Sequence, residues 1–591
     1  MKSLYIVANF YPNNSIFLVV IRSLLISFFV ICLVTNMKII YVILLFIGFI
    51  GSAESYKVLV FNPAYGASHS NFLGKLSDIL IDGGHEVTML IPVYLANKKN
   101  QIGSKKVKNI VEIGQDSRTK AIFEAGNIEH VVKSKIWTMD PEMMSHFSLI
   151  RSMNSAISHE CEFIFQQTEI LQKLRNESFD LAITESLFAC PFGMFITHSI
   201  VSMTVFFAAV FDHIGIKTVI NAESNLFKDA VKYAHGEPAA ISYFPGLFSP
   251  INDKMSFFAR IQNLIRMIFT HYLTVSRYQG ELEAIKPYYN KTKSWTELIS
   301  GVAFYFINSN QYLDYASPNL PKTVFIGGMQ VVTNKKSTKL NKHWDSLLSV
   351  RKQNVLISFG SNAHSCDMPE EYKQSFLEVF ASMPETTFIW KYEDENATLA
   401  DHLSNVELTK WMPQNDLLAD SRLTLFVTHG GLGSTMELAY QGKPALIIPL
   451  LADQPRNAHM LTRHGGSLQF DKTKLSNSED LRRAIKEVLN DKKYTESARK
   501  LANILNSQPF SPKDVVLNHC NFAVEHGTLE TLSSEGKNLN FFQFYSFDIF
   551  LGFIALVVII FSVTLISLVI LMRLLIRVVE RIVLYQKKKI E

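Results

Sequence analysis

Short apolar runs alternate with longer amphipathic stretches through the middle of this 591-residue chain. The first unit has an apolar run at 57–63, a stretch with apolar residues at helical spacing, and a second apolar run at 85–92. The apolar positions between the two runs are Phe72, Leu76, Ile79 and Leu80. This pattern predicts a strand, a helix that ends at Gly83-Gly84, and a second strand parallel to the first.

Later apolar runs fall into two series. In chain order they are FDLAIT, KTVIN, VFIGG, NVLISFG, TFIWKY, LTLFVTHGG and PALIIPL, and VFIGG, after Pro321, opens the second series. Such continuous runs are typical of parallel strands that helices cover on both faces, and the chain is long enough to bury two cores. We therefore predict an α/β protein with two facing Rossmann-like domains, at 54–315 and 325–545, joined by a linker at 316–324. Ligands of such sheets bind beyond the carboxyl ends of the strands.

Both ends of the chain carry apolar runs that a soluble domain would not expose. Ile549 to Met572 is an uncharged run of 24 residues. Such a run is long enough to cross a hydrocarbon core of about 30 Å, and we predict a transmembrane helix at 546–572. The basic tail at 573–591 places the carboxyl terminus in the cytosol, so the body is luminal and the chain is a single-pass type I membrane protein.

The sequence from Met37 has the layout of a secretory signal peptide. A lysine is followed by an apolar stretch and by small residues up to Ala53, and we predict a signal peptide at 37–53. Residues 1–36 hold a further apolar stretch. Translation from Met1 would therefore give a tandem hydrophobic leader or an uncleaved anchor. We favour Met37 as the start, because its segment has the more regular signal layout.

The last four residues, KKIE, resemble the dilysine signal that returns type I proteins to the endoplasmic reticulum. We expect the protein in the endoplasmic reticulum membrane. The alternative is a basic run that only anchors the end of the helix. Glycosylation sequons at Asn176, Asn290 and Asn396 fit a luminal glycoprotein.

The tail also carries most of the formal net charge of +5, so the body is close to neutral. A body without a basic stripe argues against nucleic acid as a partner. The five cysteines lie far apart, with no C-x-x-C pair and no His/Cys cluster at ligand spacing, so we expect no structural zinc site. For Cys161 and Cys190, a disulfide and buried free thiols both fit the sequence.

Candidate chemistry is densest at 411–457, WMPQNDLLADSRLTLFVTHGGLGSTMELAYQGKPALIIPLLADQPRN. A strand there runs into His429-Gly430-Gly431, and the next helix turns its free amides and positive dipole end toward the crevice. A pyrophosphate suits this position. The glycines, Gly433 included, lack the Cβ atoms that would keep phosphates at a distance.

Three side chains of this segment suit a nucleoside. Trp411 offers a flat ring on which a uracil can stack, and Gln414 could hydrogen-bond the edge of that base. Glu437 can accept hydrogen bonds from two ribose hydroxyls. The alternative is structural, because a helix that begins near Ser434 would make Ser434 and Glu437 a capping box.

The segment resembles the signature of the UDP-glycosyltransferases. From Tyr56 to the carboxyl terminus the chain resembles the membrane-anchored UDP-glucuronosyltransferases of animals, including those of nematodes. The resemblance implies two facing domains of the GT-B type. The turn that contains Gly360 and Ser361 also resembles the phosphate-contacting loop of this family.

The resemblance also assigns roles to single residues. It implies that His429 contacts the phosphates, that Glu437 contacts the ribose, and that Asp453 and Gln454 contact the hydroxyls of the sugar. Some relatives carry a polar residue where this chain has Gly433. The sequence therefore does not separate glucuronate from glucose as the donor sugar.

Transfer of a sugar to a hydroxyl needs a group that removes the hydroxyl proton. His69 is our candidate, because it lies near the start of the first helix, where the dipole disfavours the imidazolium. Glu185, directly after FDLAIT, is placed to hold the ring in one tautomer. By resemblance His69 matches the catalytic base of the family, whereas the family usually carries aspartate at the position of Glu185. The alternatives are a helix cap for His69 and a solvated loop carboxylate for Glu185.

The sequence thus predicts an inverting hexosyltransferase that moves glucuronate or glucose from a UDP-sugar to a hydroxyl of a small lipophilic acceptor, as in detoxification. We expect neither metal nor cofactor, because helix amides and His429 can stabilise the departing UDP and no acidic D-x-D motif stands out. The membrane is a further partner, and a homo-oligomer is compatible with the sequence. Two alternatives are a non-catalytic luminal subunit that binds UDP-sugar or a lipophilic ligand, and a sugar-nucleotide epimerase of the same architecture.

Residues 196–211 form an apolar stretch that is extra relative to the family pattern. An acceptor-pocket element, a membrane-surface contact and a mistaken exon boundary each account for it. The sequence leaves these three explanations open, along with the identity of the acceptor.

Overall fold

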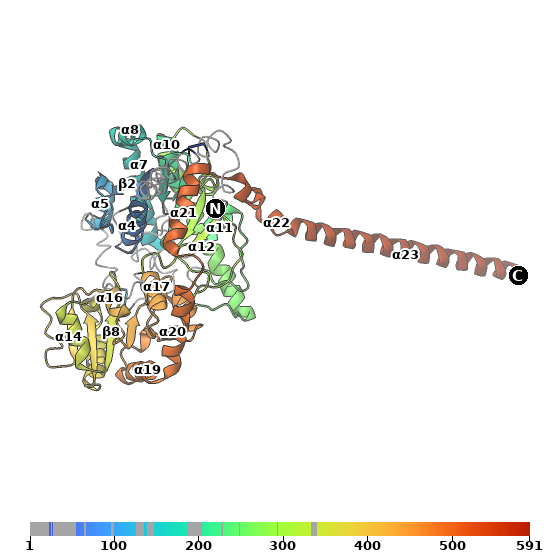
Figure 1. Ribbon diagram of the computed structural model, residues 1–591. Helices are drawn as coiled ribbons and strands as arrows, with labels where there is room; N and C mark the ends of the chain where they lie inside the picture. Colours follow the sequence, from blue (N-terminus) through green and yellow to red (C-terminus); the bar gives the residue numbers. More distant parts are fainter. Residues whose placement is uncertain are drawn as a thin grey trace. The chain divides into compact units, whose positions relative to one another are not determined.

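We describe the protein from a computed structural model (Figure 1). The structure describes residues 55–63, 67–95, 100–125, 135–138, 147–185, 204–225, 229–246, 249–291, 293–331 and 340–590, and the single residues 23, 24 and 27. Met1–Ser55 and Tyr56–Glu591 form two separate compact units. The predicted leader and signal peptide fall in the first unit, which lies almost wholly outside the described residues.

The first domain is built on a seven-stranded parallel sheet in the order β3-β2-β1-β4-β5-β6-β7. Val58 and Val60 of β1 pack into one hydrophobic core, and Leu59 and Phe61 pack into the other. Burial on both faces explains why this strand is apolar without alternation. The strands are β1 (Lys57–Phe61), β2 (Glu86–Pro92), β3 (Asn109–Ile113), β4 (Leu181–Thr184), β5 (Val219–Glu223), β6 (Phe304–Ile307) and β7 (Thr323–Phe325).

Helices of the first domain connect and cover these strands (Figure 1). The first of them ends at Asp82, and Gly84 then takes a φ of +90°, a conformation that residues with a side chain rarely adopt. The predicted strand, helix and parallel strand are confirmed. The helices are α4 (Ala67–Asp82), α5 (Ser117–Ala125), α7 (Phe147–Gln166), α8 (Thr168–Asn176), α10 (Thr204–Ile214), α11 (Asp229–His235), α12 (Phe257–Ile285) and α13 (Trp295–Ser300).

The second domain has a six-stranded parallel sheet in the order β10-β9-β8-β11-β12-β13. Its strands are β8 (Gln353–Ser358), β9 (Thr386–Lys391), β10 (Val406–Thr409), β11 (Leu425–Thr428), β12 (Ala445–Ile447) and β13 (Ser467–Gln469). Its helices are α14 (Lys342–Val350), α15 (Glu370–Ala381), α16 (Gln414–Ala419), α17 (Leu432–Gln441), α18 (Gln454–Thr462), α19 (Ser478–Asn490) and α20 (Lys492–Asn506). Two parallel α/β sheets confirm the predicted fold class.

Two segments differ from the expected division at 325. The run VFIGG does not open the second sheet, because β7 pairs with β6 and closes the first sheet, with Val324 opposite Phe306. After the second domain, α21 (Pro512–His526) returns to the first and buries Val516 and Cys520 in the core beneath α4. A run of three apolar residues does not indicate which sheet it joins. Likewise, the amphipathic pattern of α21 does not indicate which domain it packs against.

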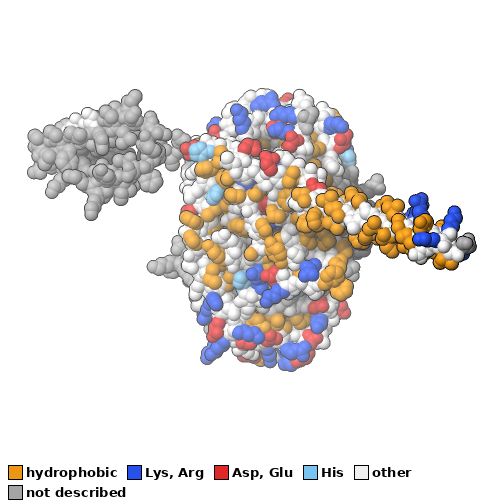
Figure 2. All heavy atoms as spheres, turned by 90° about the vertical axis from the view of Figure 1, so that its right-hand side faces the viewer, with side chains coloured by type: hydrophobic (Ala, Val, Ile, Leu, Met, Phe, Trp, Pro, Cys, Tyr) orange, Lys and Arg blue, Asp and Glu red, His pale blue; other side chains and the backbone are white. Residues whose placement is uncertain are grey.

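The chain ends in one long apolar helix, α23 (Phe547–Ile590), preceded by the short α22 (Phe541–Phe544). Among the described residues, α23 is the helix that is long and apolar enough to cross a membrane, and none of its residues is buried against the protein. Figure 2 shows its hydrophobic surface and the basic side chains near its far end. The helix continues to Ile590 and so includes most of the tail at 573–591, which the sequence predicts as a separate segment.

Two open questions from the sequence are partly answered. Cys161 is a buried free thiol, whereas Cys190 lies outside the described residues. Of the extra stretch at 196–211, the part from Thr204 belongs to α10, and Val210 and Phe211 are buried in the core. A membrane-surface contact is therefore excluded for those two residues.

Candidate active site

The first half of the site lies where β1, β4 and β5 end. These strands are neighbours in the sheet, so residues that follow them meet at one edge. His69 lies in the first turn of α4, and its Nδ1 is 3.0 Å from Oε1 of Glu185, the residue directly after β4. Both residues are buried, with exposed fractions of 4% and 0%. The structure brings the predicted pair together, and Glu185 is not a solvated loop carboxylate.

Ser224, which the sequence analysis missed, completes this cluster. Its backbone N–H donates to Oε1 of Glu185 at 2.7 Å, and its hydroxyl oxygen lies 2.6 Å from Nδ1 of His69. When Nδ1 carries the ring proton and donates it to the carboxylate, the lone pair of the imidazole is on Nε2. Ser224 follows β5 directly, so the rule that seeks chemistry after strand ends would have found it if the run KTVIN had been extended to Glu223.

His429 follows β11 in the second domain, and its ring packs against two glycines. A Cβ atom would lie 2.8 Å from Cε1 of His429 if added to Gly360, and 2.6 Å from its Nε2 if added to Gly431. Both glycines therefore make room for the ring. At Gly433 a Cβ atom would meet nothing within 4 Å, so the lack of a side chain there has no packing reason.

Lys391, at the end of β9, is a second group that the sequence analysis missed. Its ammonium donates to the carbonyl of Gly360 and lies 3.1 Å from Oε1 of Glu393. Burial, aided by the charge of Lys391, lowers the pKa of His429 to about 4. At neutral pH the ring is uncharged, so it can serve a phosphate as an N–H donor, and Lys391 supplies the nearby positive charge.

The helix after His429 begins earlier than expected. α17 starts at Leu432 with Gly431 as its N-cap, and no side chain caps it. Ser434 therefore lies inside the first turn, and the capping box proposed as an alternative for Ser434 and Glu437 does not form.

Glu437 lies in a polar cluster with α16. Its carboxylate accepts hydrogen bonds from Nε2 of Gln414 at 2.5 Å and from Nδ2 of Asn415 at 2.8 Å, and Gln414 also donates to the hydroxyl of Ser434. Burial raises the pKa of Glu437 to about 7, although both amides favour the charged form. Three predicted donor residues thus meet in one cluster, and Asn415 is a fourth member that the sequence analysis did not identify.

Asp453 and Gln454 stand at the start of α18. Gln454 is fixed by its side-chain carbonyl, which accepts the backbone N–H groups of Leu450 at 2.9 Å and Leu451 at 3.0 Å. Asp453 is buried and accepts from Asn457 at 2.8 Å. Burial raises the pKa of Asp453, and the hydrogen bond from Asn457 and the neighbouring His69 oppose that shift. The carboxyl of the second domain thus lies within electrostatic reach of the histidine of the first.

Buried groups also join the two domains. The guanidinium of Arg456, in α18, lies 2.8 Å from Oδ1 of Asp314, and it donates to the carbonyl of Pro245 at 3.2 Å. The side chains of Arg456 and Asp314 are almost fully buried. Arg456 follows Asp453 by three residues, and its contacts hold α18 against the first domain.

Trp411 and Ser361 lie at the surface. Trp411 is 73% exposed, and it lines a hollow of about 630 Å³ together with Tyr392 and Lys410. Its ring is accessible to a base, but the residues around this hollow include neither Gln414 nor Glu437. Stacking of uracil on Trp411 therefore stays a prediction.

One cluster disagrees with the expectation that no His/Cys group has ligand spacing. His364, Cys366 and Asp367, after β8, hold their potential ligand atoms within 4.8 Å of one another. His364 already lies 3.5 Å from the carboxylate of Asp367. Burial raises the pKa of the Cys366 thiol to about 11, which disfavours the thiolate that metals bind. We assign no metal to these residues.

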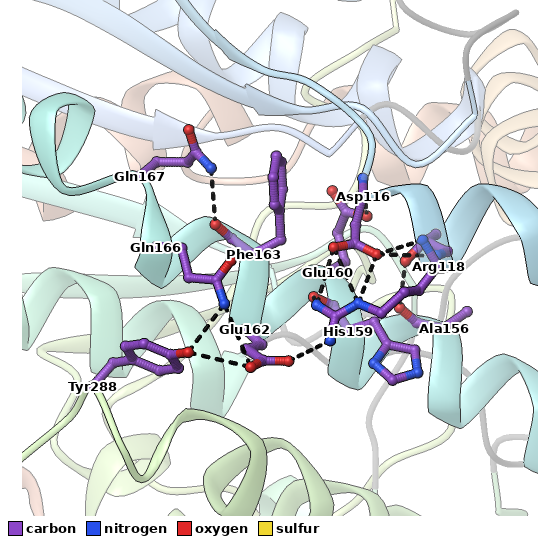
Figure 3. Close-up of polar contacts among 11 residues, drawn as sticks. Asp116, Arg118, Ala156, His159, Glu160, Glu162, Phe163, Gln166, Gln167 and Tyr288 are labelled. Atoms are coloured by element: carbon purple, nitrogen blue, oxygen red, sulfur yellow. Dashed lines mark hydrogen bonds and ion pairs between the residues drawn. The ribbon is translucent and has the colours of Figure 1, made fainter.

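A separate ionic network supports the first domain beyond β3. Arg118 lies between two carboxylates, 3.0 Å from Asp116 and 2.7 Å from Glu162 of α7 (Figure 3). Glu160 accepts the backbone N–H of Asp116 at 3.1 Å, and burial raises its pKa to about 7. These contacts fasten the segment after β3 to α7 and include none of the predicted site residues.

Comparisons with known proteins cover both domains of the chain. The model of a family described as UDP-glucoronosyl and UDP-glucosyl transferase matches residues 56–582. UDP-glucuronosyltransferase 3A1 of Bos taurus is 29% identical and covers 84% of this chain and 90% of its own length. The Caenorhabditis elegans protein ugt-48, a UDP-glucuronosyltransferase by its name, is 27% identical and covers 86% of this chain and 94% of its own length.

Solved structures show similarity of fold. The glycotransferase of kitacinnamycin aligns with a TM-score of 0.52 at 15% identity, over 80% of this chain and all of that chain. Phytolacca americana UGT2, complexed with UDP-2fluoro-glucose and pterostilbene, aligns with a TM-score of 0.50 at 15% identity and the same coverage. These likenesses support the two-domain GT-B architecture.

Proposed function

The chain belongs to the UDP-glucuronosyl and UDP-glucosyl transferase family and is a UDP-glycosyltransferase, and from that premise we propose its chemistry. It transfers glucuronate or glucose from a UDP-sugar to a hydroxyl of a small lipophilic acceptor. The observation that carries this proposal is the buried contact of 3.0 Å between His69 and Glu185. A carboxylate that holds an imidazole in this way is expected of a general base and is not required of a subunit that only binds ligands.

Proton transfer begins the proposed step. Nε2 of His69 takes the proton of the acceptor hydroxyl as the oxygen attacks the anomeric carbon. Glu185 holds the ring by Nδ1 and stabilises the imidazolium that forms. The new carbon–oxygen bond forms as the bond to UDP breaks, so one displacement inverts the anomeric centre. An α-linked donor then gives a β-glycoside.

The departing UDP gains negative charge, and the second domain offers groups to meet it. α17 starts with free backbone N–H groups, and this end of a helix is where anions bind. The neutral ring of His429 can donate an N–H, and Lys391 lies beside it. We propose that these groups suffice without a metal ion or a cofactor, and that Glu437 binds the ribose while Asp453 and Gln454 bind the sugar.

We also propose that the enzyme is anchored in the endoplasmic reticulum membrane with its body in the lumen. α23 fits a membrane anchor by length and composition. The basic residues and the dilysine pair after the apolar run support a cytosolic tail. Asn176, Asn290 and Asn396 are all exposed, which supports glycosylation at each sequon.

Activity of the full-length protein in detergent tests the proposal. UDP-glucuronate and UDP-glucose are each offered with a panel of phenols, and proton NMR assigns the linkage of the product. We expect a β-linked glycoside from one donor or both. A protein that binds UDP and gives no glycoside with any pair would support the binding subunit, and an α-linked product would contradict the single displacement.

A further inference from the structure

The first half of α12 exposes an apolar face. Its side chains recur at spacings of three and four residues, so they lie along one side of the helix. Their exposed fractions run from 37% to 74%. The residues are Phe257, Phe258, Ile261, Leu264, Ile265, Ile268 and Tyr272.

The opposite side of the same helix is buried in the first domain. Asn263, Met267, Thr270, Leu273 and Thr274 fill it, and they lie about half a turn from the exposed face at 100° per residue. The helix is therefore fixed by its inner side, and its outer apolar side is a persistent surface feature.

Charge along this outer face has one sign. Between Phe257 and Tyr272 the charged residues are Arg260 and Arg266, and that segment contains no acidic residue. After Tyr272 the exposed positions become polar, with Ser276 and Gln279. A helix with bulky apolar residues on one side, arginines beside them and a tyrosine at its edge has the composition of a helix that lies in a membrane surface.

The anchor begins beside this face. Phe257, Ile261 and Leu264 line a hollow of about 460 Å³ with Ala239, and the backbone N–H of Ala239 donates to the hydroxyl of Tyr545 at 3.0 Å. Tyr545 stands two residues before the start of α23. Figure 2 shows hydrophobic side chains on the globular surface next to the start of that helix. The apolar face of α12 is thus continuous with the point where the chain enters the membrane.

We propose that the outer face of α12 is a second membrane contact, which lies in the luminal surface of the bilayer beside the anchor. This inference rests on the membrane anchorage proposed above. An interfacial helix of this type buries its apolar side about 5–10 Å into the boundary between headgroups and acyl chains. The contact would hold the acceptor-binding domain against the phase in which lipophilic acceptors concentrate.

Site-directed spin labels on the full-length protein test this contact. Ile265→Cys places a label on the apolar face, and Ser276→Cys places a control on the same helix beyond that face. Val350→Cys is a control in the second domain, where the native residue is 64% exposed, close to the 60% of Ile265. Ile559→Cys reports the anchor. Each variant carries Cys366→Ser and is reconstituted in vesicles of phosphatidylcholine and phosphatidylserine.

Relative access of oxygen and of a water-soluble nickel chelate gives the depth of each label. We expect the label at 265 about 5–10 Å below the phosphates, the labels at 276 and 350 in water, and the label at 559 deep in the bilayer. A label at 265 that matches the one at 350 while 559 is deep would overturn the membrane contact and leave the anchor standing. A label at 559 in water would instead overturn the anchor. Strong dipolar coupling between labels at 265 on two copies, with both reagents excluded, would assign the face to a second copy and overturn the proposal.

Discussion

The two halves of the active site are held together in different ways. In the first domain, His69 of α4 and Glu185 after β4 bond directly, and Ser224 bonds to both. In the second, the ring of His429 is positioned by the absence of side chains at Gly360 and Gly431. In the proposed mechanism, the first arrangement fixes one proton-transfer atom, whereas the second clears space around a binding surface.

This difference predicts different kinetic consequences. Glu437 and Gln414 are bonded to each other, so each must share or exchange that bond when a nucleotide arrives. Nothing comparable is required of the His69 and Glu185 pair. Changes in the first half should therefore lower kcat, and changes to the polar cluster of the second should raise KM for the UDP-sugar.

Glu185→Gln should have the largest effect of the three variants that test this difference. The amide keeps the shape of the side chain but loses the charge that orients His69 and stabilises its cation. We expect kcat to fall on the order of 1,000-fold, with little change in KM for the donor, as measured by initial rates.

Glu185→Asp is the matched control. It retains the charge, and the family usually carries aspartate there, so we expect it to keep most of the activity. Equal losses in the two variants would mean that packing around residue 185, rather than its charge, supports the reaction.

Gly431→Ala should have the next largest effect. Its Cβ atom would stand 2.6 Å from Nε2 of His429, so the ring must move away from the position in which we propose that it contacts the phosphates. Displacement of about 1 Å at a reacting site costs about 100-fold, and we expect a loss of that order in kcat/KM.

Gly433→Ala serves as its control, because the new Cβ atom would meet open space. That variant should stay close to the wild type, and its thermal unfolding should match. If both alanine variants lost activity equally, the packing explanation for His429 would be wrong.

Glu437→Gln should give the smallest change, confined to donor binding. The pKa of Glu437 is about 7 because the group is buried, so the carboxyl is protonated below that pH and charged above it. The charged form accepts ribose hydroxyls more strongly, and KM for the UDP-sugar should fall as pH rises from 6 to 8 in the wild type. The glutamine variant should show a flat profile and a KM about tenfold higher at pH 8. A wild-type KM that rises over this range would contradict the role of the carboxylate.

Much of the fold follows from the sequence because its strands are buried on both faces. Continuous runs such as the one at 57–63 need no tertiary information to be recognised. The sheet to which a short strand belongs does need it, which is why VFIGG was placed in the wrong domain. The same limit applies to α21, because its amphipathic pattern does not specify which core its apolar side packs against.

The site residues likewise fall into those that the sequence pattern identifies and those that it misses. Glu185 and His429 were found because they directly follow apolar runs, and His69 was found because it lies near the start of the helix after the first run. Ser224 and Lys391 were missed because the ends of their strands were set too early or not searched. The start of α17 was misplaced because a Ser-x-x-Glu pattern indicates an N-terminus only when the backbone before it is not already helical.

In the proposed mechanism, the first domain moves the proton and the second binds the nucleotide. Calorimetric titration of UDP and steady-state turnover, both measured on one preparation of His69→Ala, test it most directly. We predict an unchanged Kd for UDP and a fall in kcat of about 100- to 10,000-fold. Undiminished turnover, or a loss of UDP affinity in parallel with turnover, would contradict it.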